Sequence, residues 1–528
     1  MTSARILITD NLNKEGIKLL EEHAIVDIQT GLKPTELISI IGKYQALIIR
    51  SQTDVTATII NAGKNLSVIG RAGIGVDNID LETATLRGIA VVNAPVGNII
   101  AAAEHTIALL LALARNIPQA NISLKSGNWN RSAFTGVELR GKNIGIIGLG
   151  KVGSEVAKRL SAFQISLLGY DPYISPSYAK NIGVELLTMD QILMKSDFIT
   201  LHLPLTESTR NLISEDQIRK MKPSVRIINA ARGGLINQDD LYKAIINDKV
   251  AGAAIDVFEE EPPVSHPLLK NDKVIVTPHL GASTAEAQRD IAIEISGQVL
   301  AVLKGQSAKY TVNSPFIKPE IRHVLMPYIA VANYVGKVAI QLAEGQVNSI
   351  NIHYQGEIAD QDVDILKSAA LVGLLTAVTN ERVNLVNSQL LAKHRGFKVA
   401  EHKEVDTESR YASMISVQLD TSKGKILVGG TAFRDIPHII RVNEYWLDLT
   451  ISGPYILAIN HQDKPGIIGM LGTICGRHDI NISFMEVGRL TPRGKAVMLV
   501  GLDDLIEDHI LDEIKSIPHV SSAIMIKL

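Results

Sequence analysis

The sequence predicts a multidomain α/β protein, and length, alternation of elements and composition support this fold class. A chain of 528 residues is too long for one hydrophobic core and should form three or four domains. Twice along its N-terminal part, short β-rich runs alternate with helical patterns, which is typical of parallel sheets with crossover helices. The content of 46% hydrophobic and 20% charged residues fits a globular protein rather than a disordered or fibrous one.

The first α/β unit has strand-like runs at 6–9, 46–50, 67–70 and 90–93. Pro95 and Gly97 then interrupt the pattern, and a strongly helical stretch follows at 99–115. We therefore expect a domain boundary near residue 97.

The second α/β unit begins with a strand at 143–147, and further strands are expected at 166–170, 198–202, 226–229, 251–256 and 274–277. A long helix at 286–305 follows and can return the chain to the first unit. The sequence thus predicts a discontinuous first domain (1–97 and 286–314), with the second domain (98–285) inserted into it.

Residues 315–452 are predicted to form a mixed α and β domain in which we find no cluster of chemical groups. Residues 453–528 show a strand, a turn, a helix and two more strands, which predicts a small βαββαβ domain.

Net charge and cysteine content exclude several classes of function. The net charge of -2 gives no basic excess for nucleic acid or an anionic membrane, so anion specificity must come from a few placed arginines. Cys475 is the only cysteine, which excludes an internal disulfide and fits a reducing cytoplasm. The N-terminal stretch lacks the pattern of a signal peptide, and the apolar helix at 107–114 is too short to cross a bilayer. We expect a cytoplasmic protein.

Gly148, Gly150 and Gly153 form a G-x-G-x-x-G motif directly after an apolar strand and before a helix that begins near Lys151 and Val152. Such glycines permit a tight turn and a close approach of backbone to pyrophosphate, and the helix N-terminus attracts the anion. The motif predicts a Rossmann-type dinucleotide site. The alternative is a glycine-rich turn that only packs a helix on a sheet.

Asp171 stands at the end of the next predicted strand. Its carboxylate can accept hydrogen bonds from both ribose hydroxyls and would repel a 2′-phosphate, and no basic residue follows it in GYDPY. NAD is therefore favoured over NADP, and no metal site is expected.

Three further side chains follow predicted strands of the second unit, where open parallel sheets place their ligands. They are Arg232 in NAARGGL, Glu261 in DVFEEEPP and His279 in TPHLGAS. A hydroxy acid needs a guanidinium for its carboxylate, an imidazole to exchange the hydroxyl proton and a carboxylate to orient the imidazole. Each residue alone also fits a solvated surface group or a turn.

The segments GLGKVG, AARGG, EEEPP and PHLGAST, in this order, resemble the D-isomer-specific 2-hydroxyacid dehydrogenase family. The resemblance implies that Arg232 binds the substrate carboxylate and carbonyl, and that His279, paired with Glu261, is the general acid/base. It places Asp256 near the nicotinamide carboxamide, although a capping role is an equal alternative. The implied cofactor positions also include Ala230, Ala231, Arg232, His279, Gly281 and Ala282.

Two histidines receive no firm role. His105 lies on the helix after the first unit, where packing and a place facing the cleft are both open. His202 follows a strand and could border the nicotinamide.

The first unit and the segment after it carry three arginines that together suit a phosphate: Arg50, Arg71 and Arg131. With RSQT and GRAGIGVDNID they resemble the long-form D-3-phosphoglycerate dehydrogenases of this family, although Gln52 and Asp54 depart from the usual wording. The resemblance places the arginines at the phosphate and adds Ser51, Gly73, Ile74 and Gly75 to the substrate site, with the 73–75 backbone at the carboxylate.

The implied reaction is NAD-dependent oxidation of D-3-phosphoglycerate to 3-phosphohydroxypyruvate, the committed step of phosphorylated serine biosynthesis. Two alternatives are another D-2-hydroxyacid dehydrogenase or reductase and a non-catalytic regulator that senses NAD.

INHQDKPGIIGMLGTICGRHDINI resembles an ACT domain, and the region before it resembles the intervening domain of long-form enzymes. The resemblance implies a flavodoxin-like first domain, a ferredoxin-like ACT domain and an amino-acid effector, serine, bound at the turn of Asp463 and Pro465. Asn481 of a neighbouring chain would close that site, and His461 replaces a tyrosine found in some relatives. The alternative is a domain that only builds the homo-oligomer, which we expect to be a dimer or tetramer.

Overall fold

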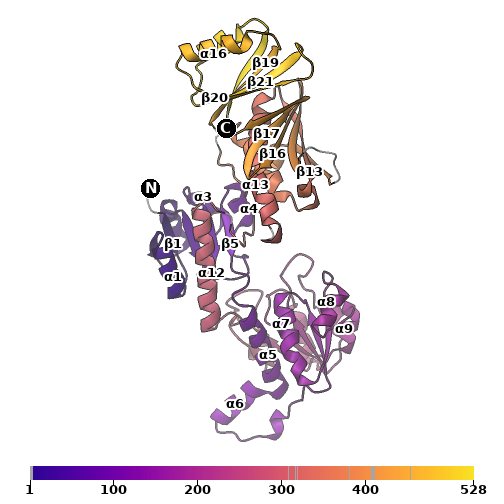
Figure 1. The fold of residues 1–528 in the computed structure, drawn as a ribbon. Helices are drawn as coiled ribbons and strands as arrows, with labels where there is room; N and C mark the ends of the chain where they lie inside the picture. Colours follow the sequence, from indigo (N-terminus) through magenta and orange to yellow (C-terminus); the bar gives the residue numbers. More distant parts are fainter. Residues whose placement is uncertain are drawn as a thin grey trace.

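The computed structural model describes residues 4–306, 308–315, 317, 319–379, 381–405, 411–451 and 453–528. Four sheets follow one another along an elongated molecule (Figure 1). The multidomain α/β fold is confirmed, whereas the exact domain limits stay a prediction, and the proposed limit at residue 452 lies outside the described residues.

The first sheet has five parallel strands in the order β2-β1-β3-β4-β5. Edge strand β2 was not predicted, because its isoleucines are half exposed and leave no buried apolar run. The strands are β1 (Arg5–Ile8), β2 (Ile25–Ile28), β3 (Ala46–Ile49), β4 (Val68–Arg71) and β5 (Ala90–Asn93), and the helices between them are α1 (Lys14–Glu21), α2 (Pro34–Ile40), α3 (Ala57–Ala62) and α4 (Leu81–Leu86).

Helix α12 (Ala285–Leu303) lies against this first sheet, as Figure 1 shows. Its Ile291, Ile295 and Val299 are buried in one cluster with Ile6 and other residues of the sheet. A Cβ on Gly70 of β4 would stand 2.7 Å from Val299, so this glycine allows the close packing of helix on sheet. The chain therefore returns to the first sheet after the second.

The second sheet has seven parallel strands in the order β12-β11-β10-β9-β6-β7-β8. Its strand order reverses between β6 and β9, and open α/β sheets bind ligands outside the strand ends at such a point. The strands are β6 (Asn143–Ile147), β7 (Ser166–Tyr170), β8 (Glu185–Leu186), β9 (Phe198–Leu201), β10 (Arg226–Asn229), β11 (Gly252–Ile255) and β12 (Val274–Val276); the helices are α5 (Ile99–Arg115), α6 (Ile117–Lys125), α7 (Lys151–Leu160), α8 (Pro176–Asn181), α9 (Met189–Lys195), α10 (Glu215–Lys220) and α11 (Gln238–Ile246).

The third sheet is mixed, with the order β14-β13-β15-β16-β17-β18. Helix α13 is long and apolar enough to cross a membrane by length and composition, but Leu325, Val331 and Val335 pack in the core of this unit. The elements are α13 (Arg322–Leu342), β13 (Val347–Gly356), α14 (Asp364–Thr376), α15 (Ser388–His394), β14 (Lys398–Glu404), β15 (Ser413–Thr421), β16 (Gly424–Phe433), β17 (Ile436–Val442) and β18 (Tyr445–Thr450).

The fourth sheet is antiparallel in the order β20-β21-β19-β22 and has the predicted βαββαβ connectivity. Its Ile456, Leu499 and Ile526 share one hydrophobic cluster with α13, so the two C-terminal sheets have a common core. The elements are β19 (Tyr455–Gln462), α16 (Ile467–Arg477), β20 (Ile482–Arg489), β21 (Lys495–Leu502), α17 (Asp508–Lys515) and β22 (Val520–Lys527).

Candidate active site

The three glycines of the motif meet three different demands between β6 and α7. Gly148 has φ 93°, and a Cβ there would stand 2.5 Å from the His202 carbonyl oxygen. A Cβ on Gly153 would overlap the Gly148 carbonyl, so this glycine lets α7 approach the strand. A Cβ on Gly150 would meet nothing within 4 Å, which leaves open space at the helix N-terminus. This cradle fits the pyrophosphate of a dinucleotide.

Asp171 lies beside this turn because two backbone N–H groups hold its carboxylate. One oxygen accepts from the Leu149 N–H at 2.9 Å, and the other accepts from the Tyr173 N–H at 2.9 Å. The acidic group thus stands next to the glycine turn, where a ribose would lie. Lys151 is exposed at the first position of α7, and Val152 beside it is partly buried.

Glu261 and His279 form the expected pair, with 2.7 Å between Glu261 Oε2 and His279 Nδ1. The other oxygen of Glu261 accepts the Phe258 N–H at 3.0 Å. Burial alone would raise the pKa of the Glu261 carboxyl, but the hydrogen bonds from His279 and Phe258 outweigh it, and the pKa lies below its ordinary value. An ionised carboxylate therefore orients the imidazole and leaves Nε2 for chemistry.

Asp256 holds the loop that carries His279. Its side chain is 0% exposed. Its oxygens accept the Thr277 hydroxyl at 2.6 Å, the Leu280 N–H at 2.8 Å and the Gly281 N–H at 3.0 Å. Its backbone carbonyl accepts the His279 N–H at 2.8 Å, and His279 has φ 55°. Asp256 thus binds the N–H groups of a loop rather than the first turn of a helix, and its contact with the nicotinamide stays a prediction.

His105 is the remaining partner of Asp256. Its Nε2 lies 3.2 Å from Asp256 Oδ1, and the side chain is largely buried. Burial would raise the pKa of Asp256, but hydrogen bonds from His105, Thr277 and the Leu280 N–H lower it overall. Of the two alternatives for His105, the structure favours a supporting role behind the loop.

Arg232 lies in a tight turn after β10 and extends toward the first unit. Its backbone carbonyl accepts from Asn229 Nδ2 at 2.9 Å, and its Nη1 donates to the Ala231 carbonyl at 2.7 Å. Its Nε lies 3.7 Å from Asp77 Oδ2. A Cβ on Gly75 would stand 2.7 Å from Arg232 Nη2. The two α/β units therefore meet at this guanidinium.

The loops that carry the three catalytic candidates are in contact with one another. A Cβ on Gly233, next to Arg232, would overlap the carbonyl of Phe258, whose N–H binds Glu261. A Cβ on Gly281 would stand 3.9 Å from the Ala230 carbonyl oxygen, and Ala282 packs against residues of the first sheet. The structure thus gathers the loops of Arg232, Glu261 and His279 at one edge of the second sheet.

Arg71 lies among other positive charges. The residue is partly buried, and its buried Nε has no hydrogen-bond partner among the described residues. Burial, followed by the charges of Arg232 and Arg50, lowers the pKa of Arg71 to about 10. The guanidinium stays protonated at neutral pH, and its charge is incompletely balanced by Asp77 and Asp10. This is the electrostatic setting of an anion site.

The neighbouring substrate candidates lie around Arg71. Asp10 Oδ2 accepts the Arg50 N–H at 2.6 Å, which fixes the start of the exposed loop at Ser51. The Ile74 carbonyl accepts from Asn93 Nδ2 at 2.6 Å. A Cβ on Gly73 would overlap the Arg71 guanidinium, so only glycine leaves room for that side chain.

Arg131 does not join this cluster within one chain. It is exposed and stands just before the short 3-10 helix Ser132–Phe134, which follows α6 in the chain. Helix α6 lies at the end of the molecule away from the first sheet (Figure 1). Among the residues that the structure describes, no contact joins Arg131 to Arg50 or Arg71. The bend of 63° between α5 and α6 carries Arg131 away from Arg50 and Arg71 of its own chain, so its place at the phosphate stays a prediction.

His202 lies at the strand end beneath the glycine turn, where its Nε2 is 3.0 Å from Thr200 Oγ1. Burial lowers the pKa of His202 to about 4, so the ring is neutral at physiological pH.

The predicted effector residues lie at one end of the fourth sheet but do not all meet. Asp463 Oδ2 accepts from Arg489 Nη1 at 2.6 Å and from the Arg493 N–H at 3.1 Å. His461 is buried, and its Nε2 has no hydrogen-bond partner among the described residues. Pro465 is exposed beside them. Arg489 was not predicted, because a strand arginine 26 residues from Asp463 carries no local signal.

Asn481 lies apart from that turn, and its Nδ2 donates to Asp503 Oδ2 at 2.6 Å. Its expected approach to the effector from a neighbouring chain stays a prediction.

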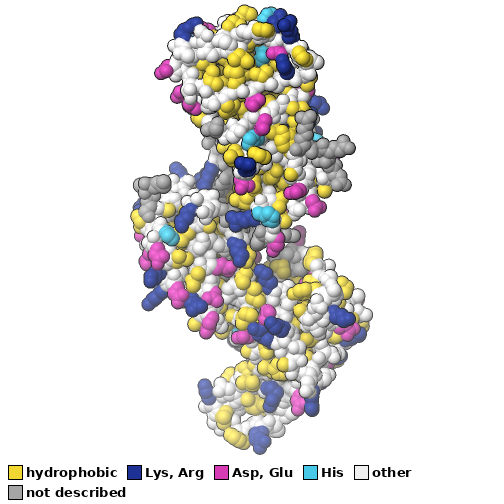
Figure 2. All heavy atoms as spheres, in the orientation of Figure 1, with side chains coloured by type: hydrophobic (Ala, Val, Ile, Leu, Met, Phe, Trp, Pro, Cys, Tyr) yellow, Lys and Arg dark blue, Asp and Glu magenta, His cyan; other side chains and the backbone are white. Residues whose placement is uncertain are grey.

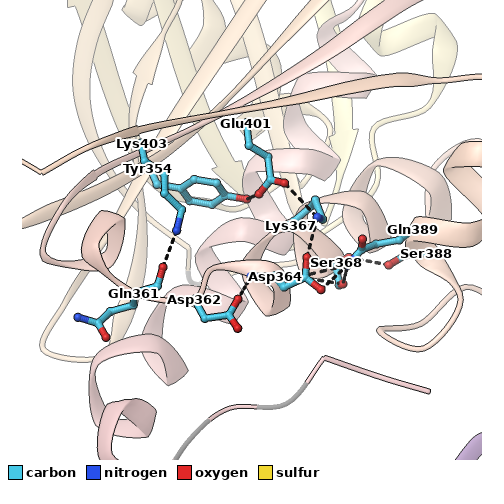
Figure 3. Close-up of polar contacts among 10 residues, drawn as sticks. All are labelled: Tyr354, Gln361, Asp362, Asp364, Lys367, Ser368, Ser388, Gln389, Glu401 and Lys403. Atoms are coloured by element: carbon cyan, nitrogen blue, oxygen red, sulfur yellow. Dashed lines mark hydrogen bonds and ion pairs between the residues drawn. The ribbon is translucent and has the colours of Figure 1, made fainter. Parts of the chain in front are cut away.

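The third unit contains a polar network that the sequence did not reveal (Figure 3). Lys367 Nζ lies 2.6 Å from Asp364 Oδ1 and 3.0 Å from Glu401 Oε1. The buried Tyr354 hydroxyl donates to Glu401 Oε2 at 3.3 Å, and Gln389 Nε2 donates to Asp364 Oδ2 at 3.2 Å. Each charge has a partner, so the network ties edge strand β14 to α14 and leaves no group free for chemistry.

Comparisons with known protein families match three consecutive segments. Residues 107–281 match the D-isomer specific 2-hydroxyacid dehydrogenase NAD binding domain, residues 324–443 the D-3-phosphoglycerate dehydrogenase intervening domain, and residues 455–519 the ACT domain. A solved D-lactate dehydrogenase from Aquifex aeolicus, complexed with NAD and lactic acid, aligns with a TM-score of 0.53 at 28% identity, over 59% of this chain and 99% of that one. A glyoxylate reductase from Paecilomyes thermophila aligns with a TM-score of 0.55 at 27% identity, over 59% of this chain and 99% of that one. Fold and site thus define an NAD-dependent dehydrogenase of 2-hydroxy acids.

Relatives of full length narrow this class. The D-3-phosphoglycerate dehydrogenase of Methanocaldococcus jannaschii is 43% identical over 525 residues, covering 99% of this chain and 100% of the relative. That of Bacillus subtilis is 40% identical over 529 residues, covering 99% of each chain. The chain belongs to the D-3-phosphoglycerate dehydrogenases that carry an intervening domain and an ACT domain.

Proposed function

We propose that the cleft around Arg232 and His279 oxidises the hydroxyl of D-3-phosphoglycerate, with Arg50 and Arg71 binding its phosphate. The observation that carries this assignment is the convergence of Arg50, Arg71 and Arg232, whose mutual repulsion contributes to the lowered pKa of Arg71. The substrate has a carboxylate at one end and a phosphate at the other. One guanidinium from the second unit and two from the first match these two anions.

When bound, NAD accepts a hydride from the carbon that bears the hydroxyl. His279 Nε2 takes the hydroxyl proton as the carbonyl forms, and Glu261 stabilises the resulting imidazolium at 2.7 Å. Arg232 holds the carboxylate in a bidentate contact and so fixes the face that the hydride leaves. In the reverse direction His279 donates the proton.

The loop of Asp256 gives His279 its orientation during this exchange. The Leu280 and Gly281 N–H groups bind the Asp256 carboxylate, so the backbone on the C-terminal side of the imidazole is fixed. Glu261 is fixed in the same way by the Phe258 N–H. Positioning of this kind lowers the entropy lost on reaching the transition state.

Substitution of Arg71 tests the phosphate assignment. In Arg71→Met, we expect kcat/KM for 3-phosphoglycerate to fall about 10- to 100-fold, the value of a charge-assisted hydrogen bond. The kcat/KM for D-glycerate, which lacks the phosphate, should change less than about threefold. Arg140→Met, at a side chain 71% exposed, is the matched control. An equal fall in kcat/KM with both substrates would favour the alternative function, a dehydrogenase of unphosphorylated hydroxy acids.

Substitution of His279 tests the acid/base. In His279→Ala, turnover should fall by about 100-fold or more while NADH binding, followed by fluorescence, is retained. Undiminished turnover in His279→Ala would remove His279 from the mechanism. If the wild-type protein binds NADH but turns over no hydroxy acid at all, the result would support the alternative of a non-catalytic NAD sensor.

We also propose that serine binds the fourth unit near Asp463 and regulates this reaction. The Asp463 carboxylate at the turn supports a polar ligand there, as does His461 Nε2, which has no hydrogen-bond partner in the described part of the chain. Calorimetry with serine should show binding that Asn481→Ala weakens. No heat of binding with the wild-type protein would refute the assignment.

We further propose that the protein is a homo-oligomer. No residue of α6 is buried, and Ile122 and Leu124 on it are more than half exposed, as is Trp129 after it. Figure 2 shows hydrophobic side chains at this end of the molecule. Sizing with light scattering should give at least a dimer, and a strict monomer would contradict the proposal.

A further inference from the structure

The linker that follows α12 runs along the first sheet before it enters the third unit. The Asn93 N–H donates to the Tyr310 carbonyl at 3.3 Å, and the Val312 N–H donates to the Val91 carbonyl at 2.7 Å. Val92 and Thr311 form an antiparallel bridge. The linker is therefore an added edge segment on β5, directly before the crossing from the first unit to α5.

Two amide side chains fix this segment. Gln298 of α12, which is 6% exposed, accepts the Tyr310 N–H at 2.7 Å and donates to the Asn93 carbonyl at 2.6 Å. Asn313 accepts the Val91 N–H at 2.8 Å and donates to the Ile89 carbonyl at 2.9 Å. The backbone position of Tyr310 is thus set from α12 and from β5.

The Tyr310 ring reaches the cofactor-binding helix of the second unit. Lys151 Nζ lies over the ring at 5.7 Å from its centroid, and Lys309 Nζ lies 5.0 Å from the same centroid. Lys151 is the first residue of α7, next to the open space at Gly150. A cation over an aromatic face is held electrostatically, so the ring restricts where this ammonium group can go.

Glu294 of α12 joins the same group of residues. Its carboxyl lies at the backbone N–H groups of Val96 and Gly97, in the crossing between the units, and within the field of Lys151 and Lys309. One of its carboxyl oxygens is buried without a hydrogen-bond partner among the described residues. The crossing, the linker and the start of α7 thus share one polar cluster.

We propose that Tyr310 is a positioning residue for the cofactor: its ring holds Lys151 at the anion-binding end of α7, which makes the linker to the two C-terminal units part of the cofactor site. The proposal rests on the assignment of the Gly148–Gly153 turn as the pyrophosphate site. Lys151 then meets the pyrophosphate from a pre-set position, and less side-chain freedom is lost on binding.

The third unit is hydrogen-bonded to the same part of the first sheet, so a movement of this unit can also reach the linker through the sheet. Arg382 Nη1 donates to the Leu66 carbonyl at 2.9 Å, Asn384 Nδ2 to the Gly88 carbonyl at 2.7 Å, and Asn387 Nδ2 to the Leu86 carbonyl at 3.3 Å. A shift of the third unit would therefore act on the start of β5 and on the linker beside it. By linkage, an effect of that shift on cofactor affinity must be matched by an effect of cofactor on the shift.

The test is a fluorescence titration of the full-length protein with NADH. In Tyr310→Leu, which keeps apolar volume but removes the ring face, we expect Kd to rise about two- to fivefold, the fold-change of a partly exposed cation–π contact. Tyr310→Phe, which keeps the ring, should restore the wild-type Kd. Tyr334→Leu is the matched control, because Lys337 lies over Tyr334 at 5.9 Å, away from the cleft.

A double-mutant cycle separates this role from a general weakening of the fold. In a Lys151→Met background, Tyr310→Leu should have no further effect on Kd, because the two residues act through one contact. Full additivity, or an unchanged Kd in Tyr310→Leu, overturns the proposal while leaving the cofactor site intact. Failure of the wild-type protein to bind NADH would instead refute the proposed function. If Tyr310→Leu does not fold, Tyr310→Met, which also removes the ring face, takes its place in the same cycle with Lys151→Met.

Discussion

Replacement of Asp256 by asparagine should loosen the His279 loop without changing the volume of the side chain. The carboxylate accepts three donors from the loop, at Thr277, Leu280 and Gly281. The asparagine amide keeps most hydrogen bonds when its NH₂ group faces the Gly281 N–H, because the oxygen on the other side then still accepts from Thr277 and Leu280. That arrangement removes one hydrogen bond to a charged acceptor and leaves the Gly281 N–H facing a second donor.

The expected cost is about 2 to 3 kcal/mol, because hydrogen bonds to charged groups contribute about 1.5 to 3 kcal/mol each. For a unit of this size, calorimetry should show a fall in Tm of about 4 to 12 °C in the transition of the second unit. The kcat should fall because His279 is carried by this loop. Thr277→Val is the comparison: it removes one hydrogen bond to the same carboxylate, at about 1.5 to 3 kcal/mol, and sets no two donors against each other.

An Asp256→Asn protein with unchanged Tm and unchanged kcat would refute the reasoning that the buried carboxylate holds the loop. A fall in kcat with unchanged Tm would instead place Asp256 in direct contact with the cofactor or substrate.

Glu261→Gln should lower kcat by about 100-fold or more with little change in KM for NAD, and an equally active variant would contradict the pairing with His279. Because the pKa of the Glu261 carboxyl is lowered in the folded protein, the wild-type Glu261–His279 pair should persist on acidification until the pH falls below the ordinary Glu value of about 4.3. The pKa of His202 is about 4 in the folded protein and about 6.5 in the unfolded chain, so as the pH falls the imidazole is protonated first in the unfolded chain. The free energy of unfolding should therefore decrease by at most about 2 kcal/mol between pH 7 and pH 5. This value is an upper limit because the ring is partly exposed. Urea unfolding of His202→Gln at pH 7 and pH 5 should show a smaller difference in unfolding free energy than the wild-type protein shows. An equal difference in both proteins would show that the ring is not buried in the neutral form. Asn384→Ala removes the 2.7 Å hydrogen bond to Gly88, so hydrogen exchange at the start of β5 should quicken with kcat little changed; unchanged exchange would mean that this contact does not hold the third unit on the sheet.

Some features could be predicted from the sequence because their signals are local. The glycines at 148, 150 and 153 stand between a strand and a helix, and the structure gives each a separate steric reason. His279 and Glu261 each follow a predicted strand, and parallel strands end at the same edge of a sheet. The βαββαβ order of the last unit also follows from its own periodicity.

Other features carried no such signal. Edge strand β2 lacks the buried apolar run of a central strand, and the Lys367–Glu401 contact joins residues far apart in the chain. The sequence also grouped Arg131 with Arg50 and Arg71, by residue type and by the family resemblance. Type does not give direction, and the bend after α5 carries Arg131 away.

The sequence by itself thus determined the fold class, the nucleotide motif and the chemical types at the strand ends, because side-chain periodicity and the φ values open to glycine act over a few residues. Only the tertiary structure decided that Arg71 lies among like charges, that the buried Asp256 carboxylate binds the loop of His279, and that Tyr310 reaches Lys151. These contacts depend on how separate sheets pack against one another, and no local pattern in the chain records that packing.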